Sequence, residues 1–133
     1  MKVFLTCLIA GLFILTVGFR IVQEPKPWPV PEAAAKKANP VKSSAESISA
    51  GKALWNQHCS SCHGKTGLGD GNKAAQLKTH PGDFSLAATQ SQSDGSLFYK
   101  VEEGRGDMPS FKKKIPDAND VWDLVNFMRT LKK

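Results

Sequence analysis

The stretch of sequence that decides the fold is Cys59-Ser60-Ser61-Cys62-His63. The spacing Cys-x-x-Cys-His is typical of covalent haem attachment. Two thiols three positions apart can each add to one vinyl group of the same porphyrin, and the adjacent histidine then lies under the iron. The motif therefore predicts one covalent haem held by Cys59 and Cys62, with His63 as the proximal iron ligand.

Two other classes of site contain a Cys-x-x-Cys pair. A structural zinc site needs four ligands. The only further thiol is Cys7, which lies in an apolar run, and neither His58 nor His80 has the usual paired spacing. A thioredoxin-like redox pair follows a strand of a βαβ unit, but no β-branched run precedes Cys59. The sequence therefore favours haem attachment over both alternatives.

A sixth iron ligand is expected from Met108. It lies in the segment Gly106-Asp107-Met108-Pro109, which is rich in turn-forming residues and outside any apolar periodicity. Met128 lies in a helical apolar stretch, where core packing is the expected role. His80 is the main rival of Met108 as the distal ligand. Ligation by His and Met raises the reduction potential relative to two histidines, which suits an electron carrier.

Together these features resemble the small monohaem c-type cytochrome family over residues 46–133. The resemblance also rests on the segments Gly51-x-x-x-Trp55, Gly64–Gly71, Pro81–Phe84 and Leu124–Leu131. It implies that a glycine permits close crossing of the first and last helices. It further implies that the carbonyl of Pro81 accepts a hydrogen bond from His63, and that Met108 lies on the distal side. His80 before Pro81 departs from the family pattern.

The periodicity predicts an all-α fold. Apolar residues recur at helical spacing over residues 47–59, 96–103 and 121–131, with a further short helix at 72–77. Either Ser43 or Ser47 is expected to cap the first helix, and Asp94 and Asp120 the next two. No strand pattern is found. We expect a cytochrome c-like domain of three to four short helices and long loops wrapped around one haem.

Three segments are expected along the chain. Residues 1–22 contain a run of 17 uncharged residues, 3–19, which fits a membrane anchor slightly better than a cleaved signal peptide. Residues 23–45 form a proline-rich linker that favours an extended conformation, and residues 46–133 form the haem domain. Either interpretation of the N-terminus places the haem domain on the periplasmic, extracytoplasmic side, anchored to the membrane or soluble after cleavage.

The charge distribution limits the classes of partner. The chain has 18 basic and 12 acidic side chains, a net charge of +6, of which +4 falls in residues 1–45. A haem domain of only +2 without aromatic-basic interleaving argues against nucleic acid. The run Lys112-Lys113-Lys114 follows Met108 and is a candidate docking site for an acidic redox protein. Its alternative role is a solvated loop.

These residues predict a one-electron carrier between exported, for example respiratory, redox partners. We expect neither a small-molecule substrate nor an enzyme activity of the chain by itself. The first alternative is a haem c subunit of a larger membrane oxidoreductase or terminal oxidase complex. The second is a haem-based sensor, in which Met108 dissociates to open a binding position.

Overall fold

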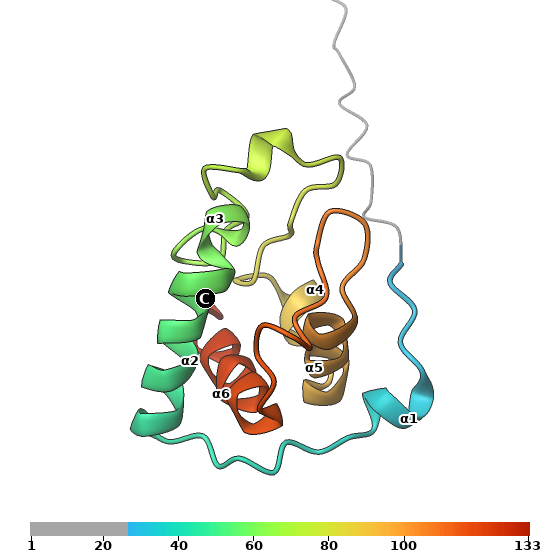
Figure 1. Cartoon of the computed structure of the whole chain (residues 1–133), viewed down its shortest axis with the longest axis vertical. Helices are drawn as coiled ribbons and strands as arrows, with labels where there is room; N and C mark the ends of the chain where they lie inside the picture. The colour runs from blue at the N-terminus through green and yellow to red at the C-terminus, as the bar shows by residue number, and fades with distance from the viewer. Residues whose placement is uncertain (1–26) are drawn as a thin grey trace, which may run out of the picture.

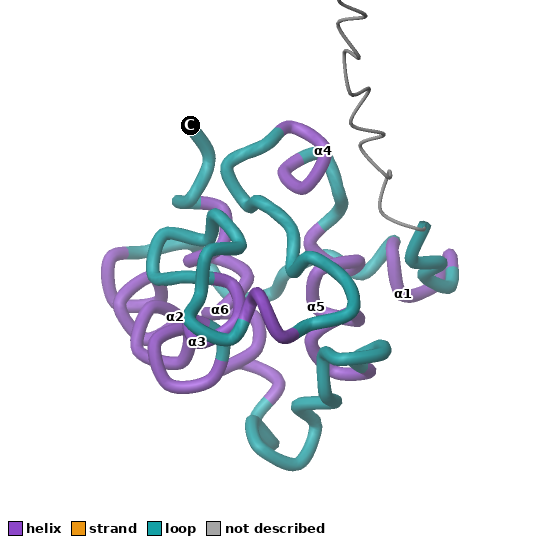
Figure 2. The backbone as a smooth tube through the Cα atoms, turned by 90° about the horizontal axis from the view of Figure 1, so that it is seen from above, coloured by secondary structure: helices purple, strands orange, loops and turns teal. Residues whose placement is uncertain are grey.

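Two long helices pack against each other, α2 (Ala45–His58) and α6 (Ala118–Arg129) (Figure 1). The computed structural model describes residues 27–133. This part of the chain is helical, with long loops and no strand, as predicted (Figure 2). The third long helix, α5 (Asp94–Glu103), packs against α6. The predicted all-α fold of short helices and long loops is therefore confirmed for residues 27–133.

A glycine sets the distance between the two crossing helices. A Cβ atom at Gly51 would overlap the carbonyl oxygen of Asp123 and would lie 2.9 Å from the Cβ of Phe127. Next to this crossing, the hydroxyl of Ser47 donates to the carboxylate of Asp123 at 2.5 Å. Backbone contact of this kind is possible only where one partner has no side chain.

The core lies between α2, α5 and α6. Trp55, Leu124 and Val125 are fully buried. Phe98 of α5 stacks on Trp122 of α6, with ring centroids 4.1 Å apart. Met128 is also buried in this core, as its helical setting predicted.

All three long helices begin earlier than their apolar stripes predicted. Ser44 caps α2 by accepting from the amide of Ser47, Ser93 caps α5, and Asp117 caps α6. The predicted caps Ser43, Ser47, Asp94 and Asp120 are therefore wrong. The reason is that the first turn of each helix is polar, so the apolar periodicity starts only after the helix has begun.

The remaining helices have only three or four residues each. These short elements are α1 (Glu32–Ala35), α3 (Ser60–His63), the 3₁₀ turn η1 (Ala74–Gln76) and α4 (Ala87–Gln90). The predicted short helix at 72–77 corresponds to η1. The other three are too short to show an apolar period, and the sequence did not predict them.

Residues 27–44, hereafter the strap, pack against the helical domain. The carbonyl of Ala35 accepts a hydrogen bond from the hydroxyl of Ser93 at 2.6 Å. The side chain of Asn39 donates to that of Asn126 at 2.9 Å. Helix α1 interrupts the extended conformation that the prolines favour, and Figures 1 and 2 both place it beside α5. This part of the predicted linker is therefore not a free spacer.

The candidate membrane anchor, residues 3–19, lies outside the described residues. Within residues 27–133, no helix combines the length and apolar character needed to cross a bilayer.

Substitution of Gly51 by Ala tests the helix crossing. The added methyl group would force α2 away from α6, and overpacking of this kind costs about 1–3 kcal/mol. We expect the free energy of unfolding of the haem-loaded protein, measured by denaturant titration, to fall by at least this amount. Lys52→Ala, on an exposed position of the same helix, is the control and should change stability by less than about 0.5 kcal/mol. Equal stability of the two variants would contradict the account of the crossing.

Candidate functional site

The Cys-x-x-Cys-His motif lies where α2 turns into α3. Cys59 follows the last residue of α2 as its C-cap and precedes α3; its amide donates to the carbonyl of Trp55 at 2.9 Å. Its own carbonyl accepts from the amides of Cys62 and His63, at 3.1 and 2.9 Å. One tight turn thus brings both thiols and the imidazole to the wall of the same cavity.

The two thiols do not form a disulfide. Burial, and then the proximity of Cys62, raise the pKa of the Cys59 thiol to about 12. A catalytic redox cysteine has a lowered pKa instead. No group of three or more His, Cys, Asp or Glu side chains in residues 27–133 is arranged to hold a metal ion. Neither alternative to haem attachment is therefore supported by the geometry.

The imidazole of His63 is held between aromatic rings. It lies 5.5 Å from the ring of Trp55 and 5.3 Å from that of Phe84, measured between centroids. Burial lowers the pKa of His63 to about 4, the backbone carbonyl of Pro81 opposes this shift, and His80 adds to it. The imidazole is therefore neutral at pH 7, which is the form that binds a metal.

The Nδ1 atom of His63 is buried and has no hydrogen-bond partner within normal distance and angle limits. Buried polar atoms are rarely left in this state without a ligand, an ion or a functional role. Pro81, whose carbonyl acts on the pKa of this imidazole, lines the same cavity. The environment of His63 therefore fits a ligand-binding imidazole with a backbone acceptor close to it.

Met108 reaches the cavity from the loop that follows α5. Its amide and carbonyl pair with those of Arg105, at 3.0 and 2.8 Å, in an isolated β-bridge. The carboxylate of Asp107 accepts from the amide of Lys78 at 2.7 Å, which ties this loop to the loop of residues 77–82. Gly104 has a φ of +68°, and a Cβ there would overlap the backbone of Met108 and Pro109. The loop therefore holds Met108 in a defined position, half-buried against the core.

His80 also lines the cavity but is exposed. Its Nδ1 accepts from the amide of Gly82 at 3.1 Å, and its ring packs over Gly69. The structure thus places both predicted rivals for the distal position at the same cavity. Met108 is the half-buried one of the two and contacts the core.

The cavity has a volume of about 1150 Å³. Binding sites for drug-sized ligands measure about 300–1,000 Å³, so this one is large enough for a flat prosthetic group. The five residues that were predicted to hold the haem or orient His63 all line it: Cys59, Cys62, His63, Pro81 and Met108. Its apolar wall includes Trp55, Phe84, Leu97, Val101 and Phe111. Thiols, a neutral imidazole and a thioether around an apolar space form a donor set that fits haem.

The three predicted docking lysines lie in different surroundings. Lys114 lines the cavity, and its ammonium lies 5.4 Å from the centroid of the Phe111 ring. Lys112 forms an exposed ion pair with Glu103, which raises its pKa. Lys113 is exposed and lies outside the cavity wall. Of the three, Lys114 is the one positioned beside the cavity.

Several residues of the cavity wall were not predicted. Trp28 and Pro27 of the strap reach it, as do Lys100 and Arg105. Burial, and then the charge of Arg105, lower the pKa of the Lys100 ammonium. The sequence contains no local signal for these contacts, because residues 28 and 105 are brought together only by the folded chain.

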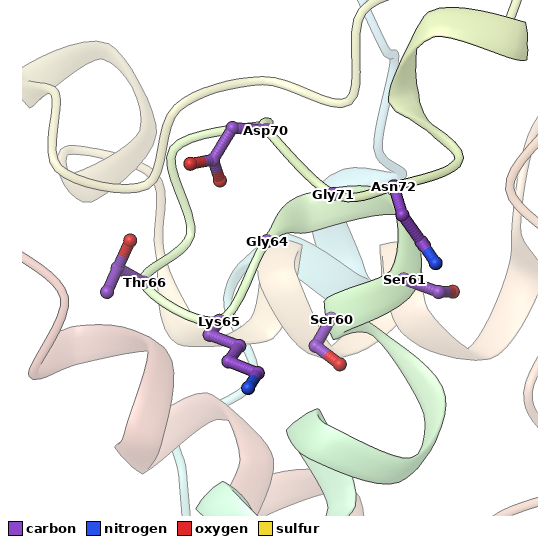
Figure 3. Close-up of a pocket in the computed structure, with 8 residues that line it drawn as sticks. All are labelled: Ser60, Ser61, Gly64, Lys65, Thr66, Asp70, Gly71 and Asn72. Carbon is purple, nitrogen blue, oxygen red and sulfur yellow. The ribbon is translucent and has the colours of Figure 1, made fainter.

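A second pocket, of about 500 Å³, lies beside the α3 turn (Figure 3). Its lining is mostly polar: Ser60, Ser61, Gly64, Lys65, Thr66, Asp70, Gly71 and Asn72. It contains none of the predicted haem-binding side chains. The glycine-rich loop that forms it is closed by the indole of Trp55, whose N–H donates to the carbonyl of Gly64 at 2.9 Å.

The size of the main cavity gives a prediction for the protein without haem. Protein interiors contain few voids larger than a water molecule, and the small domain has little other core. We expect the Cys59→Ala/Cys62→Ala double variant, which cannot form thioether bonds, to lack a cooperative thermal transition by circular dichroism. The haem-loaded parent is the control. A cooperative transition of the haem-free variant near the temperature of the parent would contradict this expectation.

Comparison with protein families identifies one matching model, described as cytochrome c oxidase, cbb3-type, subunit III, over residues 46–128. A comparison with curated proteins found no match. Among solved structures, the chain is similar to the "KustC0563 c-type cytochrome", with 32% identity and a TM-score of 0.55 over 62% of this chain and 98% of that one.

The chain is also similar in fold to a chain of the "Kuenenia stuttgartiensis reducing HAO-like protein complex Kustc0457/Kustc0458". The identity is 24% and the TM-score 0.63, over 81% of this chain. The match spans about half, 53%, of the length of that chain.

Proposed function

Because the chain belongs to the cbb3-type cytochrome c oxidase subunit III family and binds a covalent haem c, we propose that it is a one-electron carrier between redox proteins. The bound haem supplies the chemistry, since its iron cycles between Fe(III) and Fe(II). Electron transfer is the general role of such a domain. The proposal includes the residues that hold the haem and the surface through which the chain exchanges electrons.

The observation that carries the proposal is the placement of His63 and Met108 on the wall of one cavity, with Cys59 and Cys62 beside them. In the proposed arrangement, the two thiols hold the porphyrin and His63 binds the iron on the proximal side. The carbonyl of Pro81 orients the imidazole by accepting from Nδ1, so that the other nitrogen faces the iron. Met108 completes the coordination on the distal side.

If His63 and Met108 both held the iron, no position would be open for another ligand, which would favour a carrier over a sensor or an enzyme. A gas sensor or oxygen-activating haem needs an open or easily opened position. The Met108 loop is fixed by the bridge to Arg105 and by the bond between Asp107 and Lys78. A fixed position of Met108 would also keep the change in geometry on reduction of a bound haem small, so that electron transfer would need little reorganisation.

The alternative function is that of a haem c subunit within a larger oxidoreductase. The matching family is named for a subunit of an oxidase, and one structural neighbour is part of a protein complex. Stoichiometric co-purification with other membrane or redox subunits would favour this alternative. A haem domain of this class is typically extracytoplasmic, and membrane anchoring through residues 3–19 stays a prediction.

The distal ligand can be tested with two matched variants of the haem-loaded protein. We expect Met108→Ala to change the visible spectrum of the oxidised form and to allow carbon monoxide to bind the reduced form at neutral pH, because one axial position is then open. His80→Ala should leave both properties as in the parent. If His80→Ala opens the site and Met108→Ala does not, the assignment of Met108 is wrong. Ready binding of carbon monoxide by the parent would favour the sensor instead.

The charge around the cavity predicts salt-dependent electron exchange with acidic partners. Lys114, Lys100 and Arg105 lie on the cavity wall, together with Lys73 and Lys78. Such a positive rim steers negatively charged proteins, and the rate constant should fall by about tenfold or more between low and high ionic strength.

Single lysine variants test which of these charges contributes to docking of an acidic redox protein. Lys114→Gln should slow exchange with an acidic redox protein, measured by stopped-flow at low salt. Lys112→Gln should have less effect, because Lys112 does not line the cavity. Lys52→Gln, on α2, is the control. A rate that does not depend on salt, or that falls equally for all three variants, would contradict docking at this rim.

A further inference from the structure

We infer that Trp28 of the strap is a positioning residue for Met108 and acts by holding the side chain of Arg105. This inference rests on the proposed role of Met108 as the distal ligand. The strap lies outside the family-matched residues 46–128, and in this inference it contributes to the haem site.

The first observation is the contact between the strap and Arg105. The guanidinium carbon of Arg105 lies 4.6 Å from the centroid of the Trp28 indole. Its Nη1 atom donates to the carbonyl of Pro27 at 2.8 Å. A guanidinium at this distance over an indole face is attracted by the negative face of the ring. Two consecutive residues of the strap therefore fix one side chain of the distal loop.

The second observation is the backbone pairing of Arg105 with Met108. The amide of each residue donates to the carbonyl of the other, at 2.8 and 3.0 Å. Only Gly106 and Asp107 separate them, so a displacement of Arg105 moves the backbone from which the Met108 side chain projects. The path from Trp28 to Met108 thus consists of one side-chain contact and one backbone bridge.

The third observation is that the strap itself has a fixed position. A Cβ atom at Gly95 would overlap the carbonyl of Ala34, so α1 lies directly against α5. The bonds from Ser93 to Ala35 and from Asn39 to Asn126 hold the strap at two further points. Figure 1 shows the strap rising from α1 past the loop that follows α5. The strap that carries Trp28 is therefore fixed by contacts that do not involve the distal loop.

A second contact places the indole at the cavity. The ammonium of Lys100 lies 5.4 Å from the centroid of the Trp28 ring, and Lys100 is half-buried. Trp28, Lys100, Arg105 and Met108 all line the same cavity. Loss of the indole would leave Arg105 with the Pro27 bond but without its aromatic support. The loop would then sample arrangements in which the thioether is displaced from the iron.

The experiment measures imidazole binding to the oxidised, haem-loaded, full-length protein by visible spectroscopy. An external ligand must displace Met108, so its affinity reports how firmly the loop holds that residue. We expect Trp28→Ala to raise the affinity for imidazole roughly threefold to tenfold, the range of a single cation–π contact. Trp28→Phe should give a smaller increase. Lys37→Ala removes a different cation–π contact of the strap, with Phe98, and should leave the affinity as in the parent.

The same substitution in a Met108→Ala background separates positioning from simple covering of the cavity. If Trp28 acts through Met108, Trp28→Ala has no further effect once Met108 is absent. An equal increase in both backgrounds would overturn the inference, because Trp28 would then only shield the cavity. An unchanged affinity of Trp28→Ala in the parent background would also overturn it.

The role of Met108 as distal ligand and the role of Trp28 as positioning residue can be contradicted separately. If Met108→Ala alone does not raise the affinity for imidazole, the proposed distal ligand is wrong, and the inference is overturned with it. If Met108→Ala raises the affinity and Trp28→Ala does not, only the inference is overturned. A double variant of Trp28→Ala with Arg105→Ala should match Arg105→Ala alone, since both remove the same contact. Additive effects would contradict action through Arg105.

Discussion

The buried indole of Trp55 joins the helix crossing to the candidate haem site. Its ring packs against Phe127 of α6, with 5.7 Å between centroids, and against Phe84 and His63 on the cavity side. Its N–H donates to the carbonyl of Gly64, directly after the attachment motif. Because Trp55 lies one turn before Cys59 on the same helix, the position of the motif follows from the packing of α2 on α6. The absence of a side chain at Gly51 makes that packing possible.

The rest of the site is built from loops, each fixed by a few contacts to this frame. The amide of Phe84 donates to the carbonyl of Gly67, and Gln90 donates to the carbonyls of Phe84 and Met128. On the opposite side of the cavity, Met108 depends on its bridge to Arg105. A prosthetic group bound between these two sets of loops would fill the space that the small core leaves open. We therefore expect the stability of the fold to depend on the cofactor.

The sequence predicted the candidate site residues that have a local spacing signal, and the structure brings them to the wall of one cavity. Five consecutive residues specify Cys59, Cys62 and His63, and the setting of Met108 in a turn-rich loop singled it out from Met128. The three long helices were found because each repeats its apolar face over at least two turns. Their first turns were missed because these turns are polar, and α1, α3 and α4 were missed because their four residues cannot repeat an apolar period.

The contacts that the sequence did not predict join distant parts of the chain. The proline-rich segment around Trp28 was expected to be extended. The structure instead places the ring of Trp28 against Arg105, a contact between residues for which no spacing rule exists. Likewise, Lys112, Lys113 and Lys114 were predicted as one docking site. In the structure, Glu103 pairs with Lys112, and of the three only Lys114 lines the cavity. The fold thus gives charges that are close in sequence different neighbours.

The central claim is that Cys59 and Cys62 hold one haem covalently in the cavity. It is tested most directly by the intact mass of the protein, produced with the machinery for haem maturation and extracted with acidic acetone. The account predicts that the protein keeps its colour and that its mass exceeds that of the polypeptide by one haem. Single Cys→Ala variants should keep a less stable attachment, and the double variant should keep none. A colourless polypeptide of unmodified mass after extraction of the parent would contradict the account.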